Sequence, residues 1–519
     1  MKSEPVAMQA TLLLLLLFTG CSMSARILGI NPTASISHQK PFLIIMRALA
    51  ERGHQVTAIT SNPLKDPPQN LTQIDMSFTY PQAEDEEFKD LVIEITKAPT
   101  EKLPEVLLPY YEFACEAHFN FPEIKQLLRQ DEKFDVVIVE AAPTFCYFGF
   151  IHKLGPPPVI GFLSMGMTGG ISALMGDTVN PSYMPEILAP YTDHMDFWQR
   201  MDNFLSLFRQ AHSGASVILP VHEKIIRKHF GPDVPSLMDM MRNMSLFLAN
   251  NHFSANYPHP RLPNVIEMTG LHIEKERKPL PKEIQKFLDG ADNGFIYFSL
   301  GSNMRSIFLS KEIRDAFLYA FSKLPQRILW KFEEVDLPGK PENVMVSKWL
   351  PQQDVLAHRN IRLFITQGGL QSFNEAAYFG VPLLGIPCFA DQPYNIAKMV
   401  SAGIGEKMEL GEINKESLLG VIRRLLDTPS YQENMQKFSA VFREHQATSL
   451  ERAVWWVEYV IRHRGAPHLR SLSLDLMPWQ TLLLDVAAVI LLAVAVAAFL
   501  SYKVLTWLCC NVSKPRHTK

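Results

Sequence analysis

The chain has 519 residues, of which 47% are hydrophobic and 20% charged, and a formal net charge of −3 at pH 7. This composition excludes a disordered chain, and the length allows two domains with accessory segments. There is no basic excess, so nothing indicates nucleic-acid binding. Three cysteines lie away from the ends, Cys115, Cys146 and Cys388. They form neither a CxxC metal site nor a disulfide framework, and we expect them to be small buried hydrophobes.

The first 25 residues have the pattern of a secretory signal peptide. A leucine-rich apolar core, 11–18, is followed by small residues suited to cleavage. The core is too short to span a membrane. The mature chain is then expected to begin near Arg26, which makes Asn70 and Asn243 candidate glycosylation sites.

A strand–helix–strand unit follows directly. Residues 26–30 predict a strand, 41–52 a helix and 56–60 a second strand. Such units build doubly wound parallel sheets, whose ligands bind at the carboxyl ends of the strands. His38 lies in the loop predicted after the first strand, at that edge. It is either a functional base or a solvent-facing or capping histidine.

Residues 134–140 predict another buried strand, which ends in Glu140. This carboxylate is therefore also expected at the carboxyl edge, where it could orient a histidine and stabilise its protonated form. Asp135 opens the same strand, at the opposite end, and is the weaker candidate for that role.

A long irregular region is expected over 164–220. It is rich in methionine, a residue that fills adaptable apolar pockets. A pocket for varied lipophilic acceptors and ordinary core filling are equally compatible with this composition. The methionines of the region are Met165, Met167, Met175, Met184, Met195 and Met201.

The charged, proline-containing segment 273–293 predicts a linker between domains 26–272 and 294–445. The second domain repeats the alternation, with predicted strands at 294–299 and 328–332 around a helix at 311–324. Ser302 lies in the turn after its first strand, where a hydroxyl suits a phosphate.

The stretch 347–392 carries the densest set of candidate ligand-binding residues. A short strand, 363–366, meets a glycine turn and a helix at 371–378. A helix N-terminus after a glycine turn offers free N–H groups and a positive dipole end, which suits a phosphate. Trp349 suits stacking on a planar base.

Taken together, this stretch resembles the signature of the UDP-glycosyltransferases, the membrane-bound family that conjugates sugars to small lipophiles, and its Gln-Gly-Gly form is similar to the arthropod branch. The resemblance implies uracil stacking by Trp349, ribose contacts from Gln352 and Glu375, and sugar contacts from Asp391 and Gln392. It implies that the phosphates are held by Ser302, Gln367, Gly369, Gln371 and Ser372.

The resemblance also implies that His38 is the catalytic base and that the carboxylate at position 140 holds it. Many relatives have an aspartate where this chain has Glu140, histidine in place of Gln367 and asparagine in place of Gln371. Glutamine can donate to a phosphate but cannot carry a positive charge.

The C-terminal part predicts a membrane anchor. Segment 446–485 contains an amphipathic helix with Trp455, Trp456 and Tyr459, followed by a juxtamembrane stretch. In the family such a helix packs back on the first domain, and anchoring of its aromatic residues at a membrane interface is the alternative. Residues 486–508 are long and apolar enough to cross a bilayer. The basic tail 509–519 is then expected in the cytosol, which makes the chain a single-pass type I protein.

The resemblance implies an α/β fold of the GT-B type, with two facing Rossmann-like domains and a C-terminal transmembrane helix. The implied activity is inverting transfer of a sugar, by analogy glucose, from a UDP-sugar to a hydroxyl of a small lipophilic acceptor. The chain has no Asp-x-Asp pair to hold a metal on a diphosphate, so no metal and no cofactor beyond the UDP-sugar co-substrate are expected. Endoplasmic reticulum residence rests on the resemblance, and homo- or hetero-oligomers are left open. The rival interpretation is an inactive UDP-binding membrane protein that acts as a partner or ligand carrier.

Overall fold

The structure is a computed structural model that describes residues 24–80, 86–130, 132–334 and 337–512. Nearly all of the predicted signal peptide, and the last residues of the predicted cytosolic tail, lie outside the described residues. The chain forms two compact units, one that ends at Arg470 and one from Ser471 to Lys519.

The first lobe of the larger unit is built on a seven-stranded parallel sheet with the order β3-β2-β1-β4-β5-β6-β7. Its inner strands are nearly continuous runs of branched apolar residues, as expected for a sheet that is covered on both faces. The strands are β1 (Arg26–Asn31), β2 (Gln55–Thr60), β3 (Leu71–Asp75), β4 (Val136–Glu140), β5 (Val159–Leu163), β6 (Leu246–Asn250) and β7 (Val265–Met268).

The second lobe has a six-stranded parallel sheet with the order β10-β9-β8-β11-β12-β13. Two parallel sheets covered by helices confirm the predicted pair of Rossmann-like domains. The strands are β8 (Phe295–Ser299), β9 (Arg327–Lys331), β10 (Val344–Ser347), β11 (Ile361–Thr366), β12 (Leu383–Gly385) and β13 (Gly405–Lys407).

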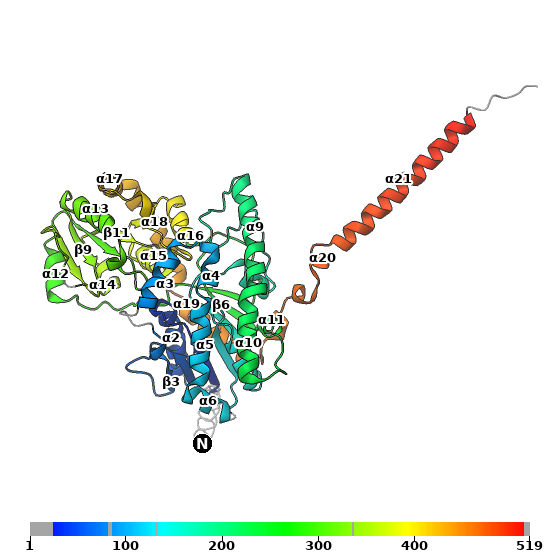
Figure 1. Ribbon diagram of the computed structural model, residues 1–519, viewed down its shortest axis with the longest axis horizontal. Coiled ribbons are helices and arrows are strands. Elements are labelled where there is room, and N and C mark those ends of the chain that lie inside the picture. Colours follow the sequence, from blue (N-terminus) through cyan, green and yellow to red (C-terminus); the bar gives the residue numbers. More distant parts are fainter. Residues whose placement is uncertain (1–23, 81–85, 131, 335–336, 513–519) are drawn as a thin grey trace, which may run out of the picture. The chain divides into compact units, whose positions relative to one another are not determined.

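Helices cover both faces of each sheet, and apolar clusters fill the space between them. Figure 1 shows α9 and α10 on one side of the compact unit and α12 and α13 on the other. The helices of the first lobe are α2 (Ile36–Glu51), α3 (Glu86–Lys97), α4 (Leu103–Val106), α5 (Leu108–Asn120), α6 (Pro122–Arg129), α7 (Tyr147–Lys153), α8 (Gly169–Leu174), α9 (Phe197–Ser213), α10 (Leu219–Phe230) and α11 (Leu237–Arg242). Those of the second are α12 (Lys282–Asp289), α13 (Lys311–Ser322), α14 (Gln352–Leu356), α15 (Leu370–Phe379), α16 (Gln392–Ser401), α17 (Lys415–Asp427) and α18 (Pro429–Gln446).

Three predicted boundaries differ from the structure. Helix α2 begins at Ile36 and contains Pro41, so His38 lies in its first turn and not in a loop. The region 164–220 is not irregular throughout, because it contains α8 and the 17-residue α9. In the predicted linker, α12 buries Ile284 and Leu288 in the core of the second lobe.

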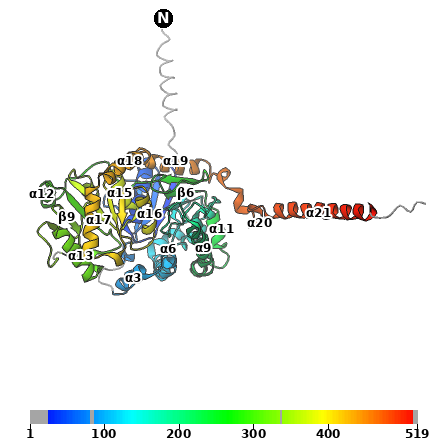
Figure 2. The same cartoon turned by 90° about the horizontal axis from the view of Figure 1, so that it is seen from above.

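Helix α19 (Ser449–Arg462) returns to the first lobe, as predicted. Its Ala453, Val454, Val457 and Val460 are buried with residues of α2 and the first sheet. Figure 2 shows α18 and α19 following one another along one side of the compact unit. The helix therefore fastens the end of the second lobe to the first.

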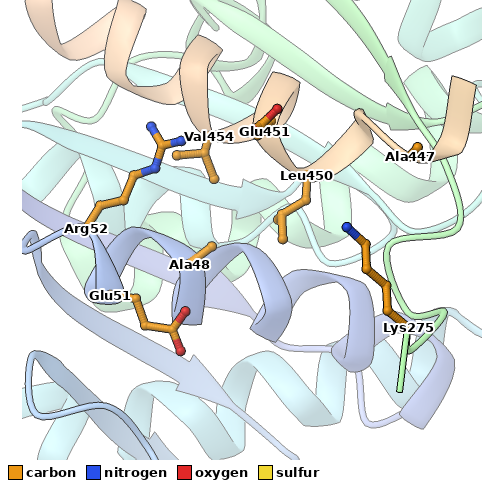
Figure 3. A pocket seen from close by; sticks show the side chains of 8 residues that line it. All are labelled: Ala48, Glu51, Arg52, Lys275, Ala447, Leu450, Glu451 and Val454. Atoms are coloured by element: carbon orange, nitrogen blue, oxygen red, sulfur yellow. The ribbon is translucent and has the colours of Figure 1, made fainter. Parts of the chain in front are cut away.

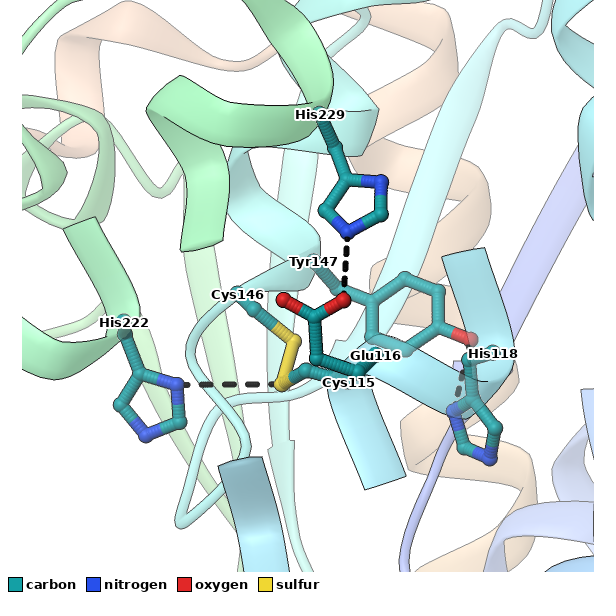
Figure 4. Close-up of a disulfide and its surroundings, with 7 residues drawn as sticks. All are labelled: Cys115, Glu116, His118, Cys146, Tyr147, His222 and His229. Carbon is teal, nitrogen blue, oxygen red and sulfur yellow. Dashed lines mark hydrogen bonds and ion pairs between the residues drawn. A yellow bond between two sulfur atoms is a disulfide. The ribbon is translucent and has the colours of Figure 1, made fainter. Parts of the chain in front are cut away.

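Cys115 and Cys146 form a disulfide, so the expectation that they are free buried thiols is wrong. The bond joins α5 to the residue before α7 and lies in the buried environment of Figure 4, with His222 Nδ1 3.8 Å from Cys115 Sγ. Spacing alone does not identify which cysteines pair, because the partners come together only through the packing of α5 on the first sheet.

Replacing both cysteines with serine is expected to lower the free energy of unfolding by about 3–4 kcal/mol, because the bond closes a 31-residue loop in the unfolded chain. Denaturant unfolding of the variant and of the wild-type protein, each without reductant, measures the difference. An equal midpoint in both would contradict a stabilising role, and Cys388→Ser serves as the control because Cys388 is a free thiol.

The second unit contains α20 (Pro478–Thr481) and α21 (Leu484–Val512). Within α21, Leu484–Cys510 has a mean hydropathy of 2.5 and is long enough to cross a membrane. In the part of the chain that the structure describes, it is the one helix that meets this test by length and composition.

Candidate active site

The carboxyl ends of β1 and β4 lie side by side and bring the predicted base and its carboxylate together. Ile30 pairs with Val139 in the parallel register, so the chain after β1 runs past Glu140, the last residue of β4. His38 Nδ1 lies 2.6 Å from Glu140 Oε1. The histidine side chain keeps 21% of its surface exposed whereas the carboxylate keeps 1%, so the ring alone can reach a ligand.

Two hydroxyl groups that the sequence did not reveal complete the surroundings of this carboxylate. Thr33 Oγ1 donates to Glu140 Oε2, and Ser164 Oγ lies 3.4 Å from Glu140 Oε1. Both follow the carboxyl ends of strands, which is the signal that could have identified them. The extra methylene of glutamate thus still leaves its carboxylate bonded on both oxygens.

Burial by itself would lower the pKa of His38, but the charge and hydrogen bond of Glu140, with a smaller contribution from Asp391, raise it above the ordinary value. Asp391 belongs to the second lobe. Burial raises the pKa of its own carboxyl, against the opposing effects of a hydrogen bond from Asn395 and of the nearby His38. The charge of a second-lobe carboxylate therefore acts on the His38 ring.

A hydrogen bond between the lobes lies one residue from the base. Gln371 Nε2, in the first turn of α15, donates to the backbone oxygen of Ser37. In a regular helix that oxygen would accept from the N–H of residue 41, but Pro41 has none. The proline therefore frees a carbonyl for the opposite lobe. The predicted phosphate contact of Gln371 stays a prediction.

We expect Gln371→Leu to loosen the contact between the lobes and to raise the KM for the donor several-fold, since a net hydrogen bond contributes about 0.5–1.5 kcal/mol. Small-angle scattering of nucleotide-free protein separates two explanations. A broader particle than the wild type indicates a bond that holds the lobes, and an unchanged particle with weaker UDP binding indicates a residue that acts on phosphate alone.

The turn between β11 and α15 has the shape of an anion site. Gly368 has φ +82°, and Gly369 caps a ten-residue helix. Gln367 is buried beside Gly301, and a Cβ at position 301 would overlap the Gln367 carboxamide. Among the described residues, nothing donates to the buried Gln367 Oε1. A flip of this amide would exchange its donor and acceptor ends.

Trp349 lies in the loop before α14 with 61% of its surface exposed, as a platform for a planar base would. Lys331, which the sequence did not single out, lies below it with Nζ 5.8 Å from the ring centroid. The same Nζ donates to Gly301 O at 2.9 Å, and Ser302 follows directly in that turn. Lys331 thus links the Trp349 ring to the turn that carries Ser302, and the base and phosphate contacts of the two stay predictions.

The predicted ribose contacts form a closed network around Glu375. Gln352 Nε2 lies 2.5 Å from Glu375 Oε2 and 3.1 Å from Ser372 Oγ, and Gln353 Nε2 lies 2.8 Å from Glu375 Oε1. Burial alone would raise the pKa of Glu375, but His272 and the two glutamines lower it. The carboxylate is therefore held ionised, as an acceptor for hydroxyl groups.

The two predicted sugar contacts sit differently. Asp391 follows Ala390, whose φ of +56° is in the left-handed region, and it bonds Asn395 Nδ2 at 2.9 Å. Gln392 Oε1 accepts from the backbone N–H groups of Cys388 and Phe389 at 2.8 and 3.0 Å. The Gln392 oxygen thus shapes its own loop, whereas the Asp391 carboxylate lies near His38.

A separate hollow of about 380 Å³ lies between α2 and α19 (Figure 3). It is lined by the last turns of α2, around Ala48 and Arg52, about 15–20 Å along the helix from His38. Its lining mixes apolar and charged side chains, and it shares no residue with the site described above.

The two Rossmann-like lobes have the arrangement of the GT-B fold, with a glycine turn before α15 on one lobe and the His38–Glu140 pair on the other. The calicheamicin glycosyltransferase has the same fold, with a TM-score of 0.57 at 18% identity over 86% of this chain and all of that one. The family described as UDP-glucoronosyl and UDP-glucosyl transferase matches residues 27–517.

Relatives cover nearly the whole chain. UDP-glucosyltransferase 2 of Dactylopius coccus is 38% identical over 505 residues, 95% of each chain. UDP-glucuronosyltransferase 2B19 of Macaca fascicularis is 31% identical over 96% of this chain and 97% of its own. The chain belongs to the UDP-glycosyltransferase family, and it is an enzyme that transfers a sugar from a UDP-sugar.

Proposed function

We propose that the protein transfers glucose from UDP-glucose to a hydroxyl of a small lipophilic acceptor, with inversion at the anomeric carbon. The observation that carries the proposal is the 2.6 Å contact of His38 Nδ1 with the buried Glu140, at the edge where the second lobe presents Gln371 and Asp391. A neutral imidazole at that edge is a general base for a hydroxyl.

The bond from His38 Nδ1–H to Glu140 leaves Nε2 as the acceptor on the exposed side of the ring. Nε2 takes the proton of the acceptor O–H as that oxygen forms a bond to the anomeric carbon. The bond from this carbon to the β-phosphate oxygen breaks, and UDP leaves with the electron pair. The imidazolium, stabilised by Glu140, later returns its proton to solvent.

We propose that the leaving diphosphate is stabilised without a metal, by the N-terminus of α15 together with Ser302, Gln367, Gly369, Gln371 and Ser372. The two carboxylates of this region support a site without a metal, because both already have hydrogen-bond partners. Glu375 accepts from two glutamines, and Asp391 accepts from Asn395. Uracil would stack on Trp349, the ribose would meet Gln352 and Glu375, and the sugar Asp391 and Gln392.

The choice of glucose follows the insect relative, whose name is UDP-glucosyltransferase 2, at 38% identity against 31% for the glucuronosyltransferase. We further propose that the protein is a type I protein of the endoplasmic reticulum membrane, anchored by α21 with both lobes in the lumen. The Cys115–Cys146 disulfide supports an oxidising compartment, and the exposed Asn243 is open to glycosylation there.

Microsomes that contain the full chain, a simple phenol and one of UDP-glucose, UDP-glucuronate or UDP-galactose test the donor choice. We expect a phenyl glucoside as the main product, formed equally well in EDTA. Preference for UDP-glucuronate would refute the proposal that UDP-glucose is the donor. A requirement for a divalent ion would refute the proposal that UDP leaves without help from a metal. UDP binding without product over a broad phenol panel would instead favour the inactive carrier.

A further inference from the structure

Helix α9 carries its apolar side chains on the outside. The exposed residues include Trp198 at 74%, Phe208 at 60% and Phe197 at 55%, while the two buried residues of the helix are Asn203 and Ser206. A surface helix of a globular protein normally has the opposite arrangement. Figure 1 shows that α9 and α10 form an outer edge of the first lobe.

The polar side of α9 is fixed to the protein, so this arrangement is built in. Asn203 is fully buried, and its Nδ2 donates to Pro181 O and Met184 O, both at 2.9 Å. Its Oδ1 accepts from Glu186 N at 2.8 Å. The Asn203 side chain thus makes three hydrogen bonds to the backbone. Rotating the helix to bury its apolar side would break all three.

The exposed apolar side chains form one continuous strip. At 100° per residue they cover an arc of about 120°, with no charged residue inside it. Arg200 lies beyond one border, and Arg209, paired with Asp202 at 3.0 Å, beyond the other. The strip consists of Phe197, Trp198, Met201, Phe204, Leu205 and Phe208.

We propose that this strip docks on a phospholipid bilayer, with α9 lying in the plane of the interface. An aromatic-rich arc bordered by arginines, on a helix too polar on its other side to cross the membrane, has the composition of an interfacial helix. Its length, about 25 Å for 17 residues, allows all six side chains to enter the headgroup boundary together.

The rest of the chain favours lipid over a protein partner. Only residues 471–483 separate the larger unit from α21, which meets the length and hydropathy needed to cross a membrane. Even fully extended, this connection reaches about 45 Å, so an anchored α21 holds the larger unit beside the bilayer. Tethering raises the effective concentration of lipid, so a modest apolar strip is enough for docking. The inference rests on the proposed membrane anchor and not on the proposed sugar or acceptor.

Quenching by brominated lipid tests the docking in the full chain, reconstituted in phosphatidylcholine nanodiscs with ordinary or acyl-brominated lipid. The difference in tryptophan fluorescence between the wild type and Trp198→Phe gives the emission of Trp198 alone. The same difference for Trp349→Phe gives the emission of Trp349, which is the matched control because this side chain is also exposed. We expect bromination to remove about half or more of the Trp198 emission, as for a ring at interfacial depth, and to leave the Trp349 emission unchanged.

A second variant keeps the test independent of the tryptophan itself. Phe204→Asp with Phe208→Asp replaces side chains that are already exposed, so the thermal midpoint should stay at that of the control Val441→Asp, an exposed position on α18. In this double variant, Trp198 should no longer be quenched. Equal Trp198 emission in both lipids for the otherwise wild-type chain overturns the proposal. If the double variant then also changes the oligomeric state in detergent, the occupant of the strip is a second copy of the chain.

Discussion

The His38→Ala variant is expected to lose about three orders of magnitude in the rate of sugar transfer while it still binds UDP. General-base catalysis by a positioned histidine accelerates a reaction by a factor of about 10²–10⁴. Among the described residues, the other groups within hydrogen-bond distance of Glu140 are the hydroxyls of Thr33 and Ser164, which cannot replace the histidine as a base. The predicted UDP-binding residues are on the other lobe, so the affinity of the variant for UDP should change little.

Single-turnover kinetics with UDP-glucose, together with calorimetry of UDP binding, give the two readouts for this variant. His194→Ala is a suitable control, because its side chain is 93% exposed and its ion pair among the described residues is with Asp193, the preceding residue. A His38→Ala protein that is folded, binds UDP and transfers sugar at the wild-type rate would remove the histidine from the mechanism.

The second large effect is expected for Glu140→Gln, which should slow transfer roughly 10²-fold and move the pH profile. The base acts only when neutral, and Glu140 raises the pKa of His38, so in the wild type kcat/KM should fall as the pH drops through a value above 6.5. Removing the carboxylate charge lowers that pKa, and the acid limb should therefore shift to lower pH.

This shift distinguishes an electrostatic partner from a structural one. Thr33→Val, which removes the hydroxyl on the other carboxylate oxygen, should slow transfer only a few-fold and leave the acid limb nearly unchanged, since the charge remains. Glu140→Gln with a reduced rate but an unshifted limb would mean that the carboxylate only shapes the loop. An unchanged rate would mean that no carboxylate holds the base.

The parallel sheets and the meeting of His38 with Glu140 were predictable from the sequence for one physical reason. Buried strands such as β4 are short, almost wholly apolar runs, and the first polar residue after such a run marks the carboxyl edge of the sheet. Two residues that follow neighbouring strands then meet there, provided that the strand order is right. The paired cysteines lacked any such local signal, because their contact depends on the packing of α5.

Other features could not be predicted because they depend on tertiary contacts. The proline at position 41 suggested a helix start, yet α2 begins five residues earlier and uses the proline to expose the Ser37 carbonyl to Gln371. Lys331, on β9, and Gln353, on α14, belong to no recognisable sequence motif. The fold alone places Lys331 beside Trp349 and Gln353 beside Glu375. The outward apolar strip of α9 was invisible for the same reason, since sequence periodicity gives a face but not its direction.

The anomeric configuration of the product tests the mechanism most directly. With UDP-glucose, whose sugar is α-linked, and a phenol as acceptor, proton NMR of the product should show only the β-glucoside, formed at a rate that depends on His38. An α-glucoside, or a β-glucoside formed as fast by the folded His38→Ala protein, would contradict a direct displacement assisted by this histidine.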